Sequence, residues 1–144
     1  MVKIDREYFE NVMRELREGL EEVKKLITVG LEEFMCNRSL RFSMRYSVVL
    51  IIEAAADLGL AILKQYFEER AKSYREVFLK LAEKGVISFG VAEKMASLAS
   101  LRNMIVHRYW SIDDARIYRE AKSSGVDVVE KFIKEVREFV SKDS

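Results

Sequence analysis

Residues 102–109, Arg-Asn-Met-Ile-Val-His-Arg-Tyr, combine the side chains of this sequence that are best suited to chemistry. His107 is the only histidine of the chain, and imidazole exchanges its proton near neutral pH, which suits acid–base catalysis. Arg102, five positions earlier, is a permanent cation whose planar fork matches phosphate oxygens. Asn103 adds an amide one helical turn before the histidine. The segment therefore indicates phosphodiester chemistry, and nothing else in the chain calls for a metal.

A structural role for His107 is the alternative interpretation. Histidines near helix C-termini commonly cap free carbonyls and interact with the helix dipole. From residue type and position alone, this capping role is the more frequent one. Further evidence is needed to favour catalysis.

The order of motifs along the chain provides that evidence. The string Arg-x4-His-x-Tyr follows Leu101 and carries Asn103 directly after its arginine. Upstream lie residues 73–78 with Leu81 and then residues 85–88, and downstream lie residues 112–114. This ordered set resembles HEPN-domain proteins, above all the HepT branch, the toxins of HEPN/minimal-nucleotidyltransferase toxin–antitoxin pairs. Arg45, Glu53 and Asp57 also fit the second helix of that family. The resemblance covers about residues 41–119, and plausibly the whole chain.

The resemblance implies an endoribonuclease toxin that dimerises and forms composite active sites at its interface. We expect one His107 to remove the 2′-hydroxyl proton, while its symmetry mate or water protonates the leaving oxygen. Arg102 would stabilise the phosphorane and Asn103 would orient the phosphate or the imidazole. Tyr109 is the residue that the nucleotidyltransferase antitoxin would silence with AMP. Arg45 and Arg108 are expected as RNA phosphate contacts, and no metal or cofactor is implied.

Two other functions remain open at this point. The chain could be a non-catalytic HEPN module that binds the nucleotidyltransferase and its nucleotide or substrate, although the complete motif argues against a pure scaffold. It could also be a helical dimer without catalysis, in which His107 caps a helix. Glu53 and Asp57 could line the cleft or serve as buried partners for Arg45 or Arg102, and we favour the buried role because buried carboxylates need partners.

Composition limits the number of domains, the possible metal sites and the cellular location of the protein. The 144 residues are expected to form one domain, 1–144, with a net charge of only +1, so any RNA contact must be local. The single cysteine, Cys36, excludes an intrachain disulfide and, with one histidine, a zinc cluster. The N-terminal residues lack the apolar core of a signal peptide. Residues 48–63, the longest apolar run, contain two acids and are too short to span a bilayer. We therefore expect a cytoplasmic protein without membrane contact.

The sequence pattern predicts an all-α protein, an antiparallel bundle of about four to five helices. Apolar residues recur every three or four positions over residues 4–34, and residues 36–39 are expected to form the turn into a helix over about 39–70. Ser73 and Ser88 are expected to cap helices that end near Gly85 and His107. A last helical region begins near residue 111, and whether residues 123–125 break it in two is left open by the sequence.

Three finer expectations concern side-chain faces. Small residues share one side of the helix over 89–107 with Asn103 and His107. They predict either close packing within the bundle or, as the resemblance favours, a self-association face; they are Ala92, Ala96 and Ala99. Arg38 and Arg41 are expected on a solvated basic stripe that continues to Arg45, which could bind phosphate or an internal acid. Trp110 is expected to pack rather than to stack on bases.

Overall fold

The computed structural model describes residues 3–142, and no strand occurs within them, so the all-α prediction is confirmed. Residues 1–2 and 143–144, at the ends of the expected domain, lie outside the described part. Five of the helices have ten or more residues. The elements are α1 (Arg6–Leu26), α2 (Leu31–Cys36), α3 (Arg38–Phe67), α4 (Tyr74–Glu83), α5 (Phe89–His107), a 3-10 turn η1 (Tyr109–Ser111), α6 (Asp114–Glu120), a π-helical turn η2 (Ala121–Gly125) and α7 (Val126–Lys142).

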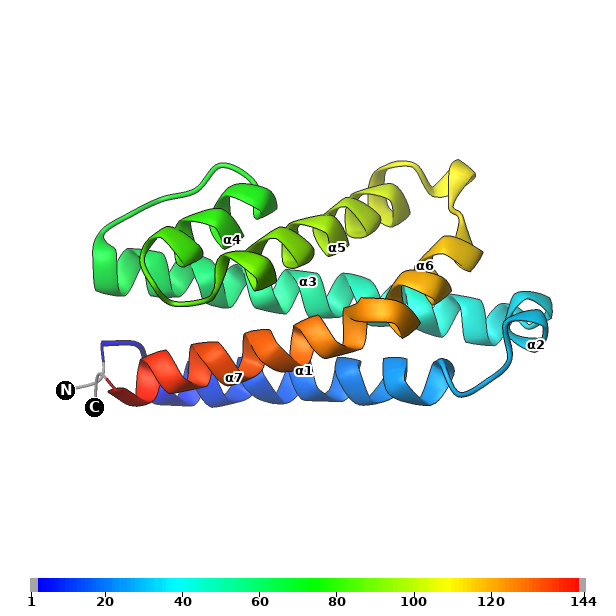
Figure 1. The fold of residues 1–144 in the computed structure, drawn as a ribbon, viewed down its shortest axis with the longest axis horizontal. Helices are drawn as coiled ribbons and strands as arrows, with labels where there is room; N and C mark the ends of the chain where they lie inside the picture. The colour runs from blue at the N-terminus through cyan, green and yellow to red at the C-terminus, as the bar shows by residue number, and fades with distance from the viewer. Residues whose placement is uncertain (1–2, 143–144) are drawn as a thin grey trace.

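The long helices form an antiparallel bundle around α3. In Figure 1, α1 and α5 run in one direction while α3 and α7 run in the other. α3 packs against α1, α4 and α5, and α7 closes the bundle against α1 and α5. The short helix α2 covers one end of α3 and contacts α6. This arrangement makes α3 the common support of every element that carries a candidate functional residue.

Side-chain caps start the helices where the sequence predicts. The Asn37 Oδ1 accepts the N–H of Leu40 at 3.2 Å at the start of α3. The hydroxyls of Ser73 and Ser88 accept the third N–H of α4 and α5, at 3.1 and 3.3 Å. Each contact satisfies one of the orphan donors of a helix start. Gly85 follows α4 with a φ of 79°, a left-handed conformation that glycine adopts without strain.

One predicted boundary is wrong, and the structure decides a second point that the sequence left open. The first helix does not continue to Phe34; it ends at Leu26, and Phe34 is buried from the separate helix α2. Tyr118 fixes the intervening loop, because its hydroxyl donates to the carbonyls of Ile27 and Val29. The last helical region is not broken at Gly125. The π-helical turn η2 connects α6 to α7 without a break. A π-helical turn is wider than an α-helical one, and this one ends at Gly125, which has no side chain to accommodate.

α3 extends at both ends beyond the apolar run of residues 48–63. By length and composition this helix of 30 residues is one that could cross a membrane. More than half of its most apolar window, 56%, is buried inside the bundle, as in the central helix of a globular core. Its close packing is visible at Gly59, where an added Cβ would lie 2.6 Å from the Cγ1 of Val77 on α4.

Candidate active site

Arg102 is the centre of a polar cluster between α3, α4 and α5. Its Nε and NH2 both donate to the Oε1 of Glu53 on α3, at 2.8 and 2.5 Å. Its guanidinium also lies over the ring of Tyr74, the first residue of α4, with 4.7 Å to the centroid. Only 14% of the arginine side chain is exposed. An ion pair and a cation–π contact therefore fix the cation from two sides.

The remaining guanidinium nitrogen of Arg102 faces the other two motif residues. NH1 donates to the Oδ1 of Asn103 at 3.1 Å and lies 3.4 Å from the Nε2 of His107. Arginine can only donate, so in a hydrogen bond between these two groups Nε2 is the acceptor. The structure thus brings together the three residues predicted to be catalytic.

The capping alternative for His107 receives no support from this geometry. His107 is the last residue of α5, and the backbone N–H of Arg108 closes the helix on the carbonyl of Met104 at 3.0 Å. Among the ring contacts of residues 3–142, the imidazole meets the guanidinium of Arg102 and no carbonyl. The ring is exposed, so a bound molecule can reach it.

The carboxylates and phenols beside Arg102 form an electrostatically coupled group. Burial, followed by the hydrogen bond to Glu53, raises the pKa of Tyr74, and Arg102 partly offsets this. Burial and the charge of Glu53 raise the pKa of Asp57, one turn further along α3. Burial and the charge of Asp57 raise the pKa of Tyr8 on α1. Of the two roles open for these acids, Glu53 is a half-buried partner for Arg102. The buried, paired role is wrong for Asp57, which is exposed and forms no ion pair with the described residues.

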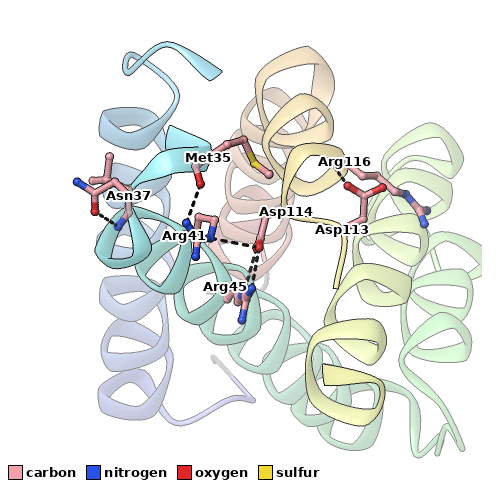
Figure 2. A network of polar contacts seen from close by, with 8 residues as sticks. Met35, Asn37, Arg41, Arg45, Asp113, Asp114 and Arg116 are labelled. Carbon is pink, nitrogen blue, oxygen red and sulfur yellow. Dashed lines mark hydrogen bonds and ion pairs between the residues drawn. The ribbon is translucent and has the colours of Figure 1, made fainter. Parts of the chain in front are cut away.

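Arg45 is held by an internal acid instead of facing a ligand. Its Nε and NH2 donate to the two carboxylate oxygens of Asp114 at 2.8 and 2.6 Å, and the Asp114 side chain is only 8% exposed (Figure 2). Arg41, expected on a solvated face, also approaches Asp114 at 3.6 Å and donates to the carbonyl of Met35 at 2.7 Å. These contacts join α3 to α6 and α2. Arg45 therefore links α3 to α6, and the expected contact between Arg45 and an RNA phosphate is not supported.

The residues after His107 are exposed. Tyr109 and Trp110 are 72% and 71% exposed, and their rings lie perpendicular to each other, with centroids 5.3 Å apart and an interplanar angle of 83°. The expectation that Trp110 packs into the protein is wrong for this chain, because the 3-10 turn η1 directs it outward. The Arg108 side chain is exposed and forms no ion pair with the described residues.

The alanine face of α5 packs inside the chain. Ala92, Ala96 and Ala99 are all at most 3% exposed, and α5 contacts α4 and α3 closely. Of the two interpretations, the structure supports tight packing within the bundle. A second copy of the chain cannot use these residues as its contact surface.

Sequence reasoning missed one member of the cluster, Tyr74. The capping motif correctly placed it at the start of α4, but nothing local showed that its ring lies under Arg102, which is 28 positions away. Only the packing of α4 on α5 brings them together.

Comparison with known proteins establishes the family. Residues 16–136 match the family described as ribonuclease HepT-like. The chain belongs to this family of HEPN-domain proteins, as its helical architecture and its Arg-x4-His-x-Tyr motif indicate.

Individual relatives agree with this assignment. A tRNA nuclease HepT from Aphanizomenon flos-aquae is 24% identical over 99 residues, which cover 69% of this chain and 67% of that protein. The fold is similar to that of the tri-AMPylated Shewanella oneidensis HEPN toxin in complex with its MNT antitoxin. The TM-score is 0.83 at 19% identity, over 93% of this chain and 98% of the toxin. It is also similar to the cytosolic protein YutE of Bacillus subtilis, with a TM-score of 0.84 at 18% identity, over 99% and 95% of the two chains.

Proposed function

We propose that this protein is a metal-independent endoribonuclease toxin of a HEPN/nucleotidyltransferase toxin–antitoxin pair, acting in the cytoplasm. The observation that carries the proposal is the single cluster formed by Arg102, Asn103 and His107, with the arginine held by Glu53. A fixed cation beside an exposed imidazole is an arrangement suited to phosphodiester cleavage. Membership of the HepT-like family and the named tRNA nuclease relative support RNA as the substrate.

The proposed reaction uses the 2′-hydroxyl of the RNA as the nucleophile. As the phosphate binds Arg102, Nε2 of His107 leaves its contact with NH1 and takes the hydroxyl proton while the 2′-oxygen forms a bond to phosphorus. The bond from phosphorus to the 5′-oxygen breaks, and this oxygen receives a proton from the second His107 of a dimer or from water. Arg102 stabilises the charge on the phosphorane, and Asn103 orients the phosphate through its amide. The products are a 2′,3′-cyclic phosphate and a 5′-hydroxyl.

A homodimer would supply the second histidine. One chain holds only one, and a two-fold axis places the same patch of two chains opposite each other. Exposed apolar side chains on the two helices that carry the cluster support this association, since such patches commonly mark contact surfaces. They are Phe42, Tyr46 and Leu60 on α3 and Val106 on α5.

Silencing by AMP transfer is the proposed mode of regulation. Tyr109 is largely exposed two positions after His107, so an antitoxin could reach its hydroxyl without unfolding the bundle. A phosphate ester here would compete for Arg102 and obstruct the imidazole. The solved toxin that this fold resembles is named as tri-AMPylated and in complex with an MNT antitoxin. Arg108, exposed beside Tyr109, is the proposed cation for an RNA phosphate.

The decisive experiment compares wild type with His107→Ala on a labelled RNA in EDTA, after mass spectrometry shows that Tyr109 is unmodified. Circular dichroism and sedimentation first establish that both proteins are folded and have the same oligomeric state. We expect wild type alone to leave 2′,3′-cyclic phosphate ends. Equal cleavage by His107→Ala would refute the mechanism.

A non-catalytic partner-binding module is the second candidate function. The exposed Tyr109 and Trp110 next to the motif favour it, because such rings also suit a protein interface. Absence of cleavage by an unmodified, folded wild type, together with capture of the minimal nucleotidyltransferase, would establish this function instead.

A further inference from the structure

Two consecutive aromatic rings remain uncovered directly beside the proposed catalytic base. Tyr109 and Trp110 are 72% and 71% exposed, and η1, which carries them, begins two residues after His107. Exposing large rings to water is unfavourable, so such residues commonly have a binding role. Because the rings meet at 83°, they present faces in two nearly perpendicular directions.

The charges around the rings are those that a polyanion requires. Arg108 precedes them and pairs with no carboxylate among residues 3–142. Of the two acids that follow, Asp114 is buried and binds Arg45, while Asp113 is exposed and its Oδ1 accepts the N–H of Arg116 at the start of α6. The segment over residues 107–110 itself therefore offers an imidazole, a cation and two rings, and contains no carboxylate.

We propose that Trp110, with Tyr109 beside it, is a stacking platform for an unpaired RNA base next to the scissile phosphate. The proposal rests on the RNase function proposed above and adds the substrate class, single-stranded RNA. Trp110 lies three residues from His107, so at most about 10 Å separates their Cα atoms. A strand whose phosphate is bound at Arg102 and His107 thus carries its neighbouring base to this ring, and Arg108 meets the next phosphate. Stacking on aromatic rings accompanied by cations is a general way of binding single strands.

Trp110 is the only tryptophan of the chain, so its fluorescence reports on the platform directly. The first test titrates short single-stranded RNA into full-length His107→Ala with unmodified Tyr109, because this variant binds without turnover. We expect the tryptophan emission to be quenched at saturation. A fully paired RNA hairpin stem, in which the bases are already stacked, should quench much less.

The second test measures cleavage by Trp110→Leu and Trp110→Phe. We expect Trp110→Leu to raise KM for single-stranded RNA by about 5- to 150-fold with little change in kcat, the factor that stacking of one base represents. Trp110→Phe, which keeps a ring, should recover much of the loss. Phe89→Ala is the matched control. Its ring is 61% exposed at the first residue of α5, about 27 Å from the helix end, and its loss should leave KM unchanged.

The outcomes separate this proposal from the proposed function. Cleavage by wild type with an unchanged KM in Trp110→Leu, or the absence of quenching by bound RNA, overturns the platform and leaves the nuclease assignment intact. A change in dimerisation or antitoxin binding in Trp110→Leu, with RNA binding unaffected, overturns it in favour of a protein interface. Quenching by RNA with no cleavage by wild type supports the platform and refutes the nuclease.

Discussion

Replacing Glu53 by Gln tests whether the orientation of Arg102 matters for catalysis. In the wild type, one carboxylate oxygen of Glu53 accepts both Nε and NH2 of Arg102, at 2.8 and 2.5 Å. Glutamine keeps the shape and one acceptor oxygen but removes the charge. In the proposed reaction Arg102 contacts the phosphate, whereas Glu53 contacts only Arg102. We therefore regard Glu53 as a positioning residue and Arg102 as catalytic.

The size of the effect follows from the burial of the pair. Because Arg102 stays charged, the glutamine would still accept a charge-assisted hydrogen bond. What is lost is the attraction between two opposite charges, which contributes about 0–1 kcal/mol at exposed sites and about 3–5 kcal/mol when a buried pair is broken. The Arg102 side chain is 14% exposed but that of Glu53 is 36% exposed, so solvent screens part of this attraction. We expect Glu53→Gln to lower the free energy of unfolding by about 1–2 kcal/mol, a fall in Tm of about 3–8 °C for a chain of this size.

The kinetic expectation differs from that of a purely structural residue. With the carboxylate gone, the charge of Arg102 is no longer offset, so KM for RNA should stay level or fall. The guanidinium also loses its fixed orientation, so kcat should fall about tenfold, which corresponds to about 1.4 kcal/mol of transition-state stabilisation. Urea unfolding and steady-state cleavage of one labelled RNA measure the two effects separately.

Asp57→Asn is the matched control, because it makes the same chemical change one turn further along α3. Asp57 forms no ion pair with the described residues, and its replacement should leave kcat unchanged. A Glu53→Gln protein that loses stability as expected but retains full kcat would refute the positioning role.

Three further predictions concern neighbouring residues. Tyr74→Phe keeps the ring under Arg102 and should retain kcat, whereas Tyr74→Leu removes a cation–π contact of about 0.5–2 kcal/mol and should lower kcat roughly 3- to 30-fold in the same cleavage assay. Burial and the charge of Glu53 raise the pKa of Asp57 in the folded protein, so its charged form costs stability above that pKa. Asp57→Asn should therefore be more stable than wild type at pH 7, by on the order of a few tenths of a kcal/mol, and the gain should vanish at pH 3 in urea melts. Asp114→Asn weakens a bidentate pair with Arg45 and should cost about 2–3 kcal/mol of stability by urea unfolding, with unchanged kcat at temperatures where the variant is folded.

Each of these has an outcome that would contradict it. Equal activity of the two Tyr74 variants would show that the ring does not orient Arg102. A stability difference for Asp57→Asn that persists unchanged at pH 3 would mean that ionisation is not its cause. A fall in kcat for folded Asp114→Asn would indicate that Arg45 contributes to catalysis, as an RNA contact would.

Sequence signals within a few residues predicted the helices and their caps. Contacts between residues that are far apart in the sequence could not be predicted in this way. Ser73 and Ser88 were identified as caps because the interaction lies within four residues of the chain. The break before α2 was missed because apolar periodicity continues through it, although Gly30 lies at the start of α2. The pairing of Arg45 with Asp114 joins residues 69 positions apart, and no periodicity reveals such a contact.

The same limit applies to the candidate site. The motif placed Arg102 and His107 on one helix, but residues five positions apart lie about 140° apart around its axis. Their 3.4 Å contact also depends on the reach of the long arginine side chain. Whether Glu53 faced the cleft or an internal cation depended on how α3 packs on α5. Trp110 was misjudged because a helical wheel carries no information beyond the end of the helix, and α5 ends at His107.

Two ion pairs from α3 bracket the segment that carries the aromatic rings. Glu53 holds α5 at Arg102, and Arg45 holds α6 at Asp114, so both ends of the intervening segment are attached to the same buried helix. The turn between them can open and close locally while its ends stay in place. In hydrogen exchange, we expect the amides of Tyr109, Trp110 and Ile112 to exchange faster than the hydrogen-bonded amides of Arg108 and Ser111, and those at the centre of α3 to exchange only on global unfolding. An enzyme that modifies Tyr109 would then meet a short, tethered segment, at no cost to the stability of the bundle.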